Sequence, residues 1–168
     1  DNSGNATIRI CGNITVSGNI TIQNNTVLEI TKGSTLTVNG LNMNGNAGNV
    51  IVYPTGTLNI TQNVSFYGDV TNHGTMDLSR EANFNGNFTN NGTITVRGTN
   101  TTTSGNNGAL TNNGNMTVDG NFNQNSNNVL VNNCYLNIKK QFLMDRSVQN
   151  YEYIQVDGNY RSNGNSLL

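Results

Sequence analysis

Short tetrads of alternating polar and apolar residues recur along the chain and predict its fold. They begin at residues 13, 35, 57, 75, 93, 115, 135 and 153, so successive copies are 18 to 22 residues apart. In every copy the second and fourth positions are apolar, and the third is Thr, Asn, Asp or Gln. Alternation of this kind is typical of β-strands that bury one face.

Two further apolar positions accompany the tetrads in similar register. One stands six places before the second tetrad position in all eight copies, at Ile8, Ile30, Val52, Val70, Phe88, Leu110, Leu130 and Val148. Another follows most tetrads, at Ile20, Leu41 or Met43, Val64, Phe84, Phe122, Phe142 and Tyr160. Gly and Asn collect between these pieces, where sharp corners need residues that tolerate left-handed backbone. Each repeat therefore predicts three short strands separated by corners.

We predict an all-β chain folded as a parallel β-solenoid, with stacked β-arches forming a β-helix of about eight rungs of 18–22 residues. Residues 1–168 are expected to form one domain, with a short lead-in at 1–6. An extruded loop is expected at 97–108, because no apolar strand follows Val96. The seven Asn-Gly dipeptides would also suit an antiparallel meander or sandwich, but neither explains the fixed repeat. The choice between two and three sheets per rung stays open.

Stacking places equivalent residues above one another at about 4.8 Å, so the tetrads predict two ladders. The core ladder is apolar and consists of Ile14, Leu36, Leu58, Met76, Ile94, Met116, Leu136 and Ile154. The outward ladder is mostly Thr and Asn and consists of Thr15, Thr37, Asn59, Asp77, Thr95, Thr117, Asn137 and Gln155. Asn side chains stacked in this way hydrogen-bond to one another in cross-β assemblies.

Composition narrows the functions that the chain can have. It contains 37 Asn, 21 Thr and 19 Gly, only 10% of its residues are charged, and its net charge is −1. No basic stripe marks a partner such as nucleic acid or an anionic membrane. No apolar run reaches the roughly 18 residues of a membrane span. Because the chain begins at Asp1 rather than Met, we expect an exported, processed form that resides outside the cell or at its surface.

The reactive side chains do not predict an enzyme. His73 is the only histidine and lies in a corner, and the nine carboxylates do not converge on one cleft of the expected coil. Two distant Cys and one His do not make a zinc site, and no Asp-rich calcium repeat is present. We therefore expect no catalytic residue, no metal site and no cofactor.

Two resemblances follow from the repeats. The motifs Asn91–Ile94 and Asn113–Met116, an apolar strand after Asn-Gly, resemble the right-handed parallel β-helices of secreted filamentous-haemagglutinin-type adhesins. The small size, the Gly/Asn/Thr-rich stacked pattern and the pair Cys11 and Cys134 resemble the amyloid-like structural proteins of the tubular cell sheath of methanogenic archaea. Those sheath subunits fold as two-sheet arches, whereas the present pattern favours three strands per turn.

The ends of the coil suggest the function. Soluble solenoids cover their terminal rungs with polar caps, but here the tetrad pattern begins at Asn13 and persists to Val156 without one. Open edges would let a copy of the chain add its strands, giving a homopolymer such as a filament or sheath. A fragment of a longer solenoid would look the same. Residues 139–161, with seven of the 17 charges, could guard one edge.

Cysteines and sequons supply the candidate covalent sites. Cys11 and Cys134 lie about six rungs apart, roughly 25–30 Å, well beyond the roughly 7 Å that a disulfide spans between Cα atoms. They are candidates for a disulfide between subunits, or else free thiols. Ten Asn-x-Ser/Thr sequons are present, and Asn100, Asn5 and Asn24 are the glycosylation candidates.

Two other functions are compatible with the pattern. The first is a secreted adhesin or carbohydrate-binding module, with glycan contacts at Tyr53, Tyr67, Tyr135, Tyr151 and Tyr153. The second is ice binding through Thr-x-Thr rows, although both threonines occur only at Thr35/Thr37 and Thr93/Thr95.

Overall fold

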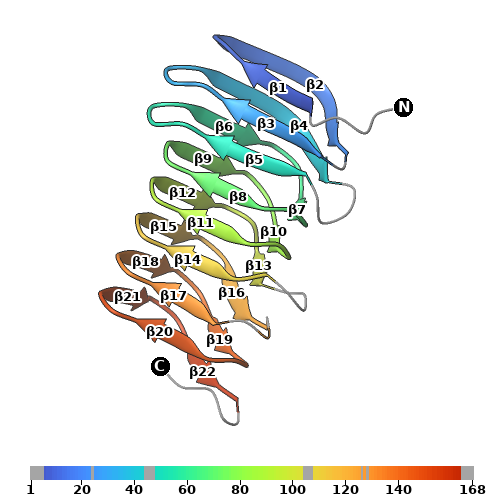
Figure 1. Ribbon diagram of the computed structural model, residues 1–168. Helices are drawn as coiled ribbons and strands as arrows, with labels where there is room; N and C mark the ends of the chain where they lie inside the picture. The colour runs from blue at the N-terminus through green and yellow to red at the C-terminus, as the bar shows by residue number, and fades with distance from the viewer. Residues whose placement is uncertain are drawn as a thin grey trace.

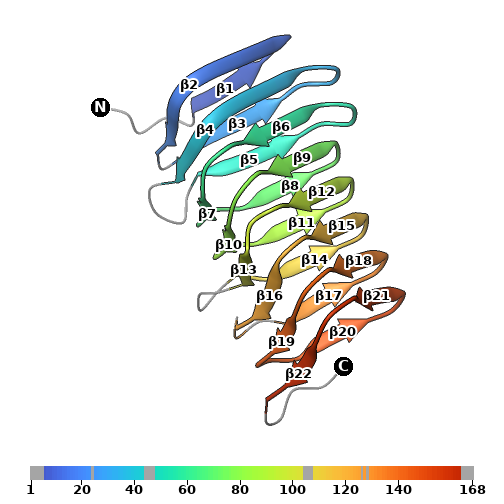
Figure 2. The same ribbon diagram turned by 180° about the vertical axis from the view of Figure 1, so that it is seen from behind.

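The computed structural model describes residues 6–23, 25–43, 48–103, 108–125, 127 and 129–163. These segments form 22 strands and no helix. Every pairing between the strands is parallel. Figures 1 and 2 show the rungs stacked in one column, with β1 at the blue end and β22 at the red end. The predicted parallel β-solenoid is confirmed.

Each rung contributes strands to three faces. The first face stacks β1 (Ala6–Ile10), β3 (Thr26–Ile30), β5 (Asn49–Val52), β8 (Val70–Asn72), β11 (Phe88–Asn90), β14 (Leu110–Asn112), β17 (Leu130–Asn132) and β20 (Val148–Asn150). The second stacks the tetrads β6 (Thr57–Ile60), β9 (Thr75–Leu78), β12 (Thr93–Val96), β15 (Asn115–Val118), β18 (Tyr135–Ile138) and β21 (Tyr153–Val156). The third stacks β7 (Val64–Phe66), β10 (Ala82–Phe84), β13 (Asn100–Thr103), β16 (Asn121–Gln124), β19 (Phe142–Met144) and β22 (Tyr160–Ser162).

Two long strands at the N-terminal end join the second and third faces. β2 (Asn13–Ile22) and β4 (Thr35–Met43) run across both, and the register of their pairing shifts between Val16 and Asn19. Hydrogen bonding therefore gives two sheets, of eight and 14 strands, although each rung has three faces. The eight strands of the first sheet correspond to the eight repeats in the sequence.

The predicted core ladder is present in the predicted register. Its members pair rung by rung from Ile14 to Ile154. The six central side chains are completely buried, whereas Ile14 is 39% exposed and Ile154 is partly buried. Only the end members are open because only they lack a rung on one side. Three phenylalanines, Phe66, Phe84 and Phe88, pack together inside the middle rungs.

Two details of the sequence prediction are wrong. The expected loop at 97–108 contains β13, which pairs with β10 and β16 and buries Thr101 and Thr103 where other rungs bury apolar residues. Residues 104–107 of that loop lie outside the described segments. Ile30 and Val52 also do not belong to the ladder of Val70. They pair with Ile10 and Asn72, because the first corners of the second and third rungs are longer than those of the other rungs.

Thr101 offers a stability test. Its hydroxyl is fully buried and has no hydrogen-bond partner, and burying an unpaired hydroxyl costs about 1–3 kcal/mol. We expect the isosteric Thr101→Val to raise the free energy of unfolding by about 1 kcal/mol in urea titrations. The matched control Thr103→Val should lower it, because the Thr103 hydroxyl donates to Gln124 Oε1. A less stable Thr101→Val protein would show that the hydroxyl has a partner, such as a bound water.

Candidate functional site

A ladder of buried asparagines is the most distinctive chemical feature of the coil. Asn72, Asn90, Asn112 and Asn132 point into the core at the end of the first face and are 0% exposed. Each donates its side-chain Nδ2 to Oδ1 of the asparagine in the next rung, from Asn72 through to Asn150, at 2.7–2.8 Å. The ladder therefore has a direction, with every donor facing the C-terminal end.

The same amide groups also bind the backbone. Nδ2 of each of the four buried asparagines donates to the carbonyl of the first tetrad residue in the next rung, at 3.0–3.1 Å. Oδ1 of Asn72 and Asn90 accepts from the corner amides of Gly74 and Gly92 at 3.1 and 3.3 Å. These bonds tie the first face to the second, so the ladder fixes both the rung spacing and the corner.

This inward ladder was not predicted from the sequence. Stacked asparagines were expected on the outward ladder, whereas the longest row of bonded asparagines, from Asn72 to Asn150, lies inside. The signal was nevertheless present: an Asn stands two residues after Val70, Phe88, Leu110, Leu130 and Val148. Residues two apart in a strand share a face, so each of these Asn must point inward with the preceding apolar residue.

The predicted outward ladder lies where expected. Its eight members pair in register from Thr15 to Gln155 along the second face. One side-chain hydrogen bond joins two of them, with Asn59 Nδ2 donating to Thr37 Oγ1 at 3.1 Å. A second exposed row occupies the first corner, where Asn133 donates to Asn113 and Asn113 to Asn91, at 2.7 and 2.8 Å. The lateral surface is thus lined by polar rows.

Charged residues form a short row that begins at Asp77 of the outward ladder. Arg97 contacts Asp77 at 2.7 Å and Asp119 at 3.9 Å, and Lys139 contacts Asp119 at 3.1 Å. The hydrogen bond from Arg97 to Asp77, and then the charge of that carboxylate, raise the pKa of Arg97. Arg97 therefore stays protonated at any physiological pH. Opposite charges on successive rungs favour the parallel register, although half-exposed pairs contribute little stability.

The two cysteines are free and lie at the same corner of the coil, in the first and seventh rungs. A second copy stacked beyond the last rung would place its Cys11 two rungs from Cys134, or about 9.6 Å. That separation exceeds what a disulfide spans. A disulfide between copies therefore requires a side-by-side contact and stays a prediction.

The structure places the predicted glycosylation sites and glycan-contact tyrosines in different settings. Asn100 is exposed, but it lies at the start of β13, and its Oδ1 accepts from Asn121 at 3.1 Å. Asn5 and Asn24 lie outside the described residues. Among the tyrosines, Tyr135 and Tyr153 stack at 5.3 Å with nearly parallel rings, and Tyr151 is 67% exposed. Tyr53 and Tyr67 are separate from this stack and are 37% and 45% exposed.

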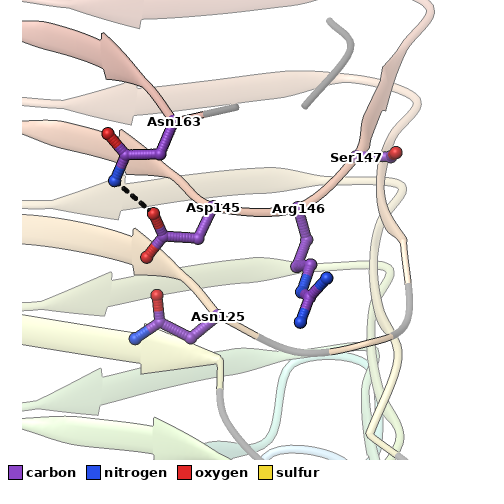
Figure 3. Close-up of a pocket in the computed structure, with 5 residues that line it drawn as sticks. All are labelled: Asn125, Asp145, Arg146, Ser147 and Asn163. Atoms are coloured by element: carbon purple, nitrogen blue, oxygen red, sulfur yellow. Dashed lines mark hydrogen bonds between the residues drawn. The ribbon is translucent and has the colours of Figure 1, made fainter. Parts of the chain in front are cut away.

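A polar hollow lies at a corner between the third and first faces. It has a volume of about 580 Å³ and is lined by Asn125, Asp145, Arg146, Ser147 and Asn163. Figure 3 shows Asn125, Asp145 and Asn163 in a column, with Asn163 donating to the Asp145 carboxylate. Over the described segments, no three His, Cys, Asp or Glu side chains gather as metal ligands, and no helix is long and apolar enough to cross a membrane.

Both ends of the coil present open edges. Within the described residues no strand lies beyond β1 and β2 at one end, or beyond β20, β21 and β22 at the other. Apolar side chains reach these edges: Ile8 and Ile14 are 38% and 39% exposed, and Ile154 and Val156 are only partly buried. Among the described residues, each edge strand therefore has no strand on its outer side, and part of the apolar core is exposed there.

The fold and these edges define the chain as a parallel β-solenoid with exposed terminal rungs. Comparison with protein-family models, with curated proteins and with solved structures gives no match.

Proposed function

We propose that the protein is a structural subunit that assembles with copies of itself, edge to edge, into an extracellular filament or sheath. The open edges are the observation that supports it most directly. A parallel edge offers a row of unpaired N–H and C=O groups to another strand, and the apolar ladders ending at Ile14 and Ile154 leave core surface to cover. Heterologous contacts of this kind produce filaments when they do not close into a ring.

The lateral faces are consistent with a passive structural role. They consist of polar rows that bond along the coil axis, such as Asn91, Asn113 and Asn133, and they are not strongly charged. Stability in such a coil is a sum over neighbouring rungs, so a longer stack is a more stable stack. A sheath would gain strength in this way without any other chemistry.

Negative-stain electron microscopy and sedimentation of the purified chain test the proposal. We expect filaments, or rings, whose amount rises with concentration above a threshold. Dilution below that threshold should dissolve them, because the contacts are non-covalent. Monodisperse monomers at high concentration would contradict self-assembly.

A glycan-binding module is the second candidate, and one observation favours it. The stacked Tyr135 and Tyr153 rings and the exposed Tyr151 gather near one corner of the last two rungs, and aromatic faces are common sugar contacts. The same sedimentation experiment separates the two proposals, since a binding module has no need to polymerise. The Thr rows expected for ice binding are interrupted by Asn, Asp and Tyr, so we do not develop that alternative.

A further inference from the structure

Asn150, the last member of the buried asparagine ladder, lacks the bond that defines the others. Asn72, Asn90, Asn112 and Asn132 each donate to the carbonyl of the first tetrad residue in the following rung. Asn150 accepts from Asn132 at 2.8 Å, but its own Nδ2 donates to the Glu152 carbonyl, in the same corner, at 3.2 Å. Asn132 makes the same bond within its own corner, to the Cys134 carbonyl at 3.0 Å, in addition to its bond to the next rung. Asn150 therefore lacks only the bond to a following rung.

Gly18 is the matching feature at the opposite edge. It lies in the corner Ser17–Asn19, and the corners Asp119–Asn121 and Asp157–Asn159 have the same pattern, with Gly then Asn. In those later corners a Cβ would collide with the preceding rung: one on Gly120 would lie 2.2 Å from the Gly98 carbonyl oxygen, and one on Gly158 would lie 2.0 Å from that of Lys140. Lys140 occupies the same position in the rung between them, so the backbone there can shift to accept a side chain. A Cβ on Gly18 would meet nothing within 4 Å, so the isolated chain has no steric need for glycine there.

We propose that the two features meet in a head-to-tail contact between two copies of this chain. The N-terminal edge of the second copy occupies the position of the next rung, with its strands parallel to β20, β21 and β22. Asn150 then donates to the Asn13 carbonyl of the second copy, and Gly18 of the second copy lies over Gly158. This contact rests on the proposed function and gives it a defined register and polarity.

The two edges fit in that register. Three residue steps separate Asn150 from Tyr153, as they separate Ile10 from Asn13, and four separate Val156 from Tyr160, as they separate Val16 from Ile20. The first and second corners of the last rung therefore have the same lengths as those of the first. The longer corners of the second and third rungs would not match in this way.

Side chains across the contact are also compatible. Extending the observed register places Ile8 over Val148 and Ile14 over Ile154, so both exposed isoleucines become buried. Arg9 would face Gln149, Arg161 would face Thr21, and Asp157 would face Ser17, so no like charges oppose each other. The least favourable pairing is that of Ile10 with Asn150. The Ile10 side chain has no acceptor for Asn150 Nδ2, so the Asn13 carbonyl must accept that hydrogen bond.

The experiment compares assembly by three variants with that of the wild-type chain. Asn150→Asp keeps the acceptor for Asn132 but removes the donor and points a carboxylate at a carbonyl. We expect its threshold concentration for sedimentation to rise at least tenfold, because a carboxylate buried without a positive charge beside it opposes binding. Gln149→Glu adds the same charge on the outward side of the same strand, where it would face Arg9 of the second copy, so its threshold should stay the same or fall by less than about fivefold. Gly18→Ala should raise the threshold for assembly while leaving the melting temperature of the dilute monomer unchanged.

Mixing experiments test the polarity. Asn150→Asp chains retain a normal N-terminal edge, so one part in ten should cap growing wild-type filaments and shorten them. If the Asn150→Asp and Gly18→Ala chains form filaments as readily as the wild-type chain does, this contact is overturned but the proposed function stands. A wild-type chain that forms no filaments would overturn both.

Discussion

Replacing Phe84 with alanine is expected to lower the free energy of unfolding by about 3–5 kcal/mol, the usual cost of removing a buried phenylalanine. Phe84 is 1% exposed, lies 5.8 Å from the Phe66 ring in a stacked arrangement, and meets Phe88 edge-on at 4.6 Å. The cavity would open between rungs held at a fixed spacing by their backbone hydrogen bonds, so neighbouring side chains can fill little of it. Urea titration followed by far-UV circular dichroism measures the loss.

Two controls show whether the loss comes from the aromatic cluster. Phe84→Leu keeps most of the volume and should cost less than about 1.5 kcal/mol. Tyr67→Ala removes an aromatic ring that is 45% exposed and should cost less than about 1 kcal/mol. If Phe84→Ala cost no more than Phe84→Leu, the core would be able to collapse around the missing ring, and the rungs would be less rigid than their pairing implies.

The position and register of the tetrad strands could be predicted from the sequence alone. Their alternation and their regular spacing both follow from burying one face of a strand once in every turn of the coil. A strand with one face buried alternates, and a coil repeats that alternation once per turn. Leu36 and Leu58 could therefore be assigned to one ladder before any coordinates were known, and they pair as predicted. The pairing predicted for the first face was wrong at Ile30 and Val52. Those residues were assigned by counting back from the tetrad, and the corner between the two strands varies in length from rung to rung.

β13 was missed for a different reason. Its inward residues, Thr101 and Thr103, are polar, so a search for apolar residues finds no strand there. The backbone follows its neighbours all the same: Asn83 pairs with Thr102, and Thr102 with Asn123. In a stack, the strands above and below can impose β structure on a segment whose own composition predicts a loop. The outward polar faces could be predicted from the sequence, but the inward polar rows could not. Polarity alone does not distinguish an exposed side chain from a buried one that is hydrogen-bonded to its neighbours.

Asn90→Leu is expected to cost about 2–4 kcal/mol, even though it adds apolar surface to the core. The change leaves the Asn112 Oδ1 without its donor and removes the acceptors used by Asn72 Nδ2 and the Gly92 amide. Buried polar groups that lose a partner each cost about 1–3 kcal/mol. Urea titration again measures the change. Asn91→Leu, at the exposed neighbouring position, is the matched control and should cost less than about 1 kcal/mol.

Replacing all five asparagines of the buried ladder together should lower the free energy of unfolding much less per site than replacing one of them alone. In the first three rungs the same ladder is apolar, with Ile10, Ile30 and Val52, so the backbone accepts aliphatic side chains at this position. A variant with Val at 72, 90, 112, 132 and 150 removes donors and acceptors together, and removing both partners is cheaper than orphaning one. Its loss of unfolding free energy should therefore fall well below the sum of the five single Asn→Val losses. Simple additivity would show that the asparagines act as five separate hydrogen-bonding sites rather than as one directional network.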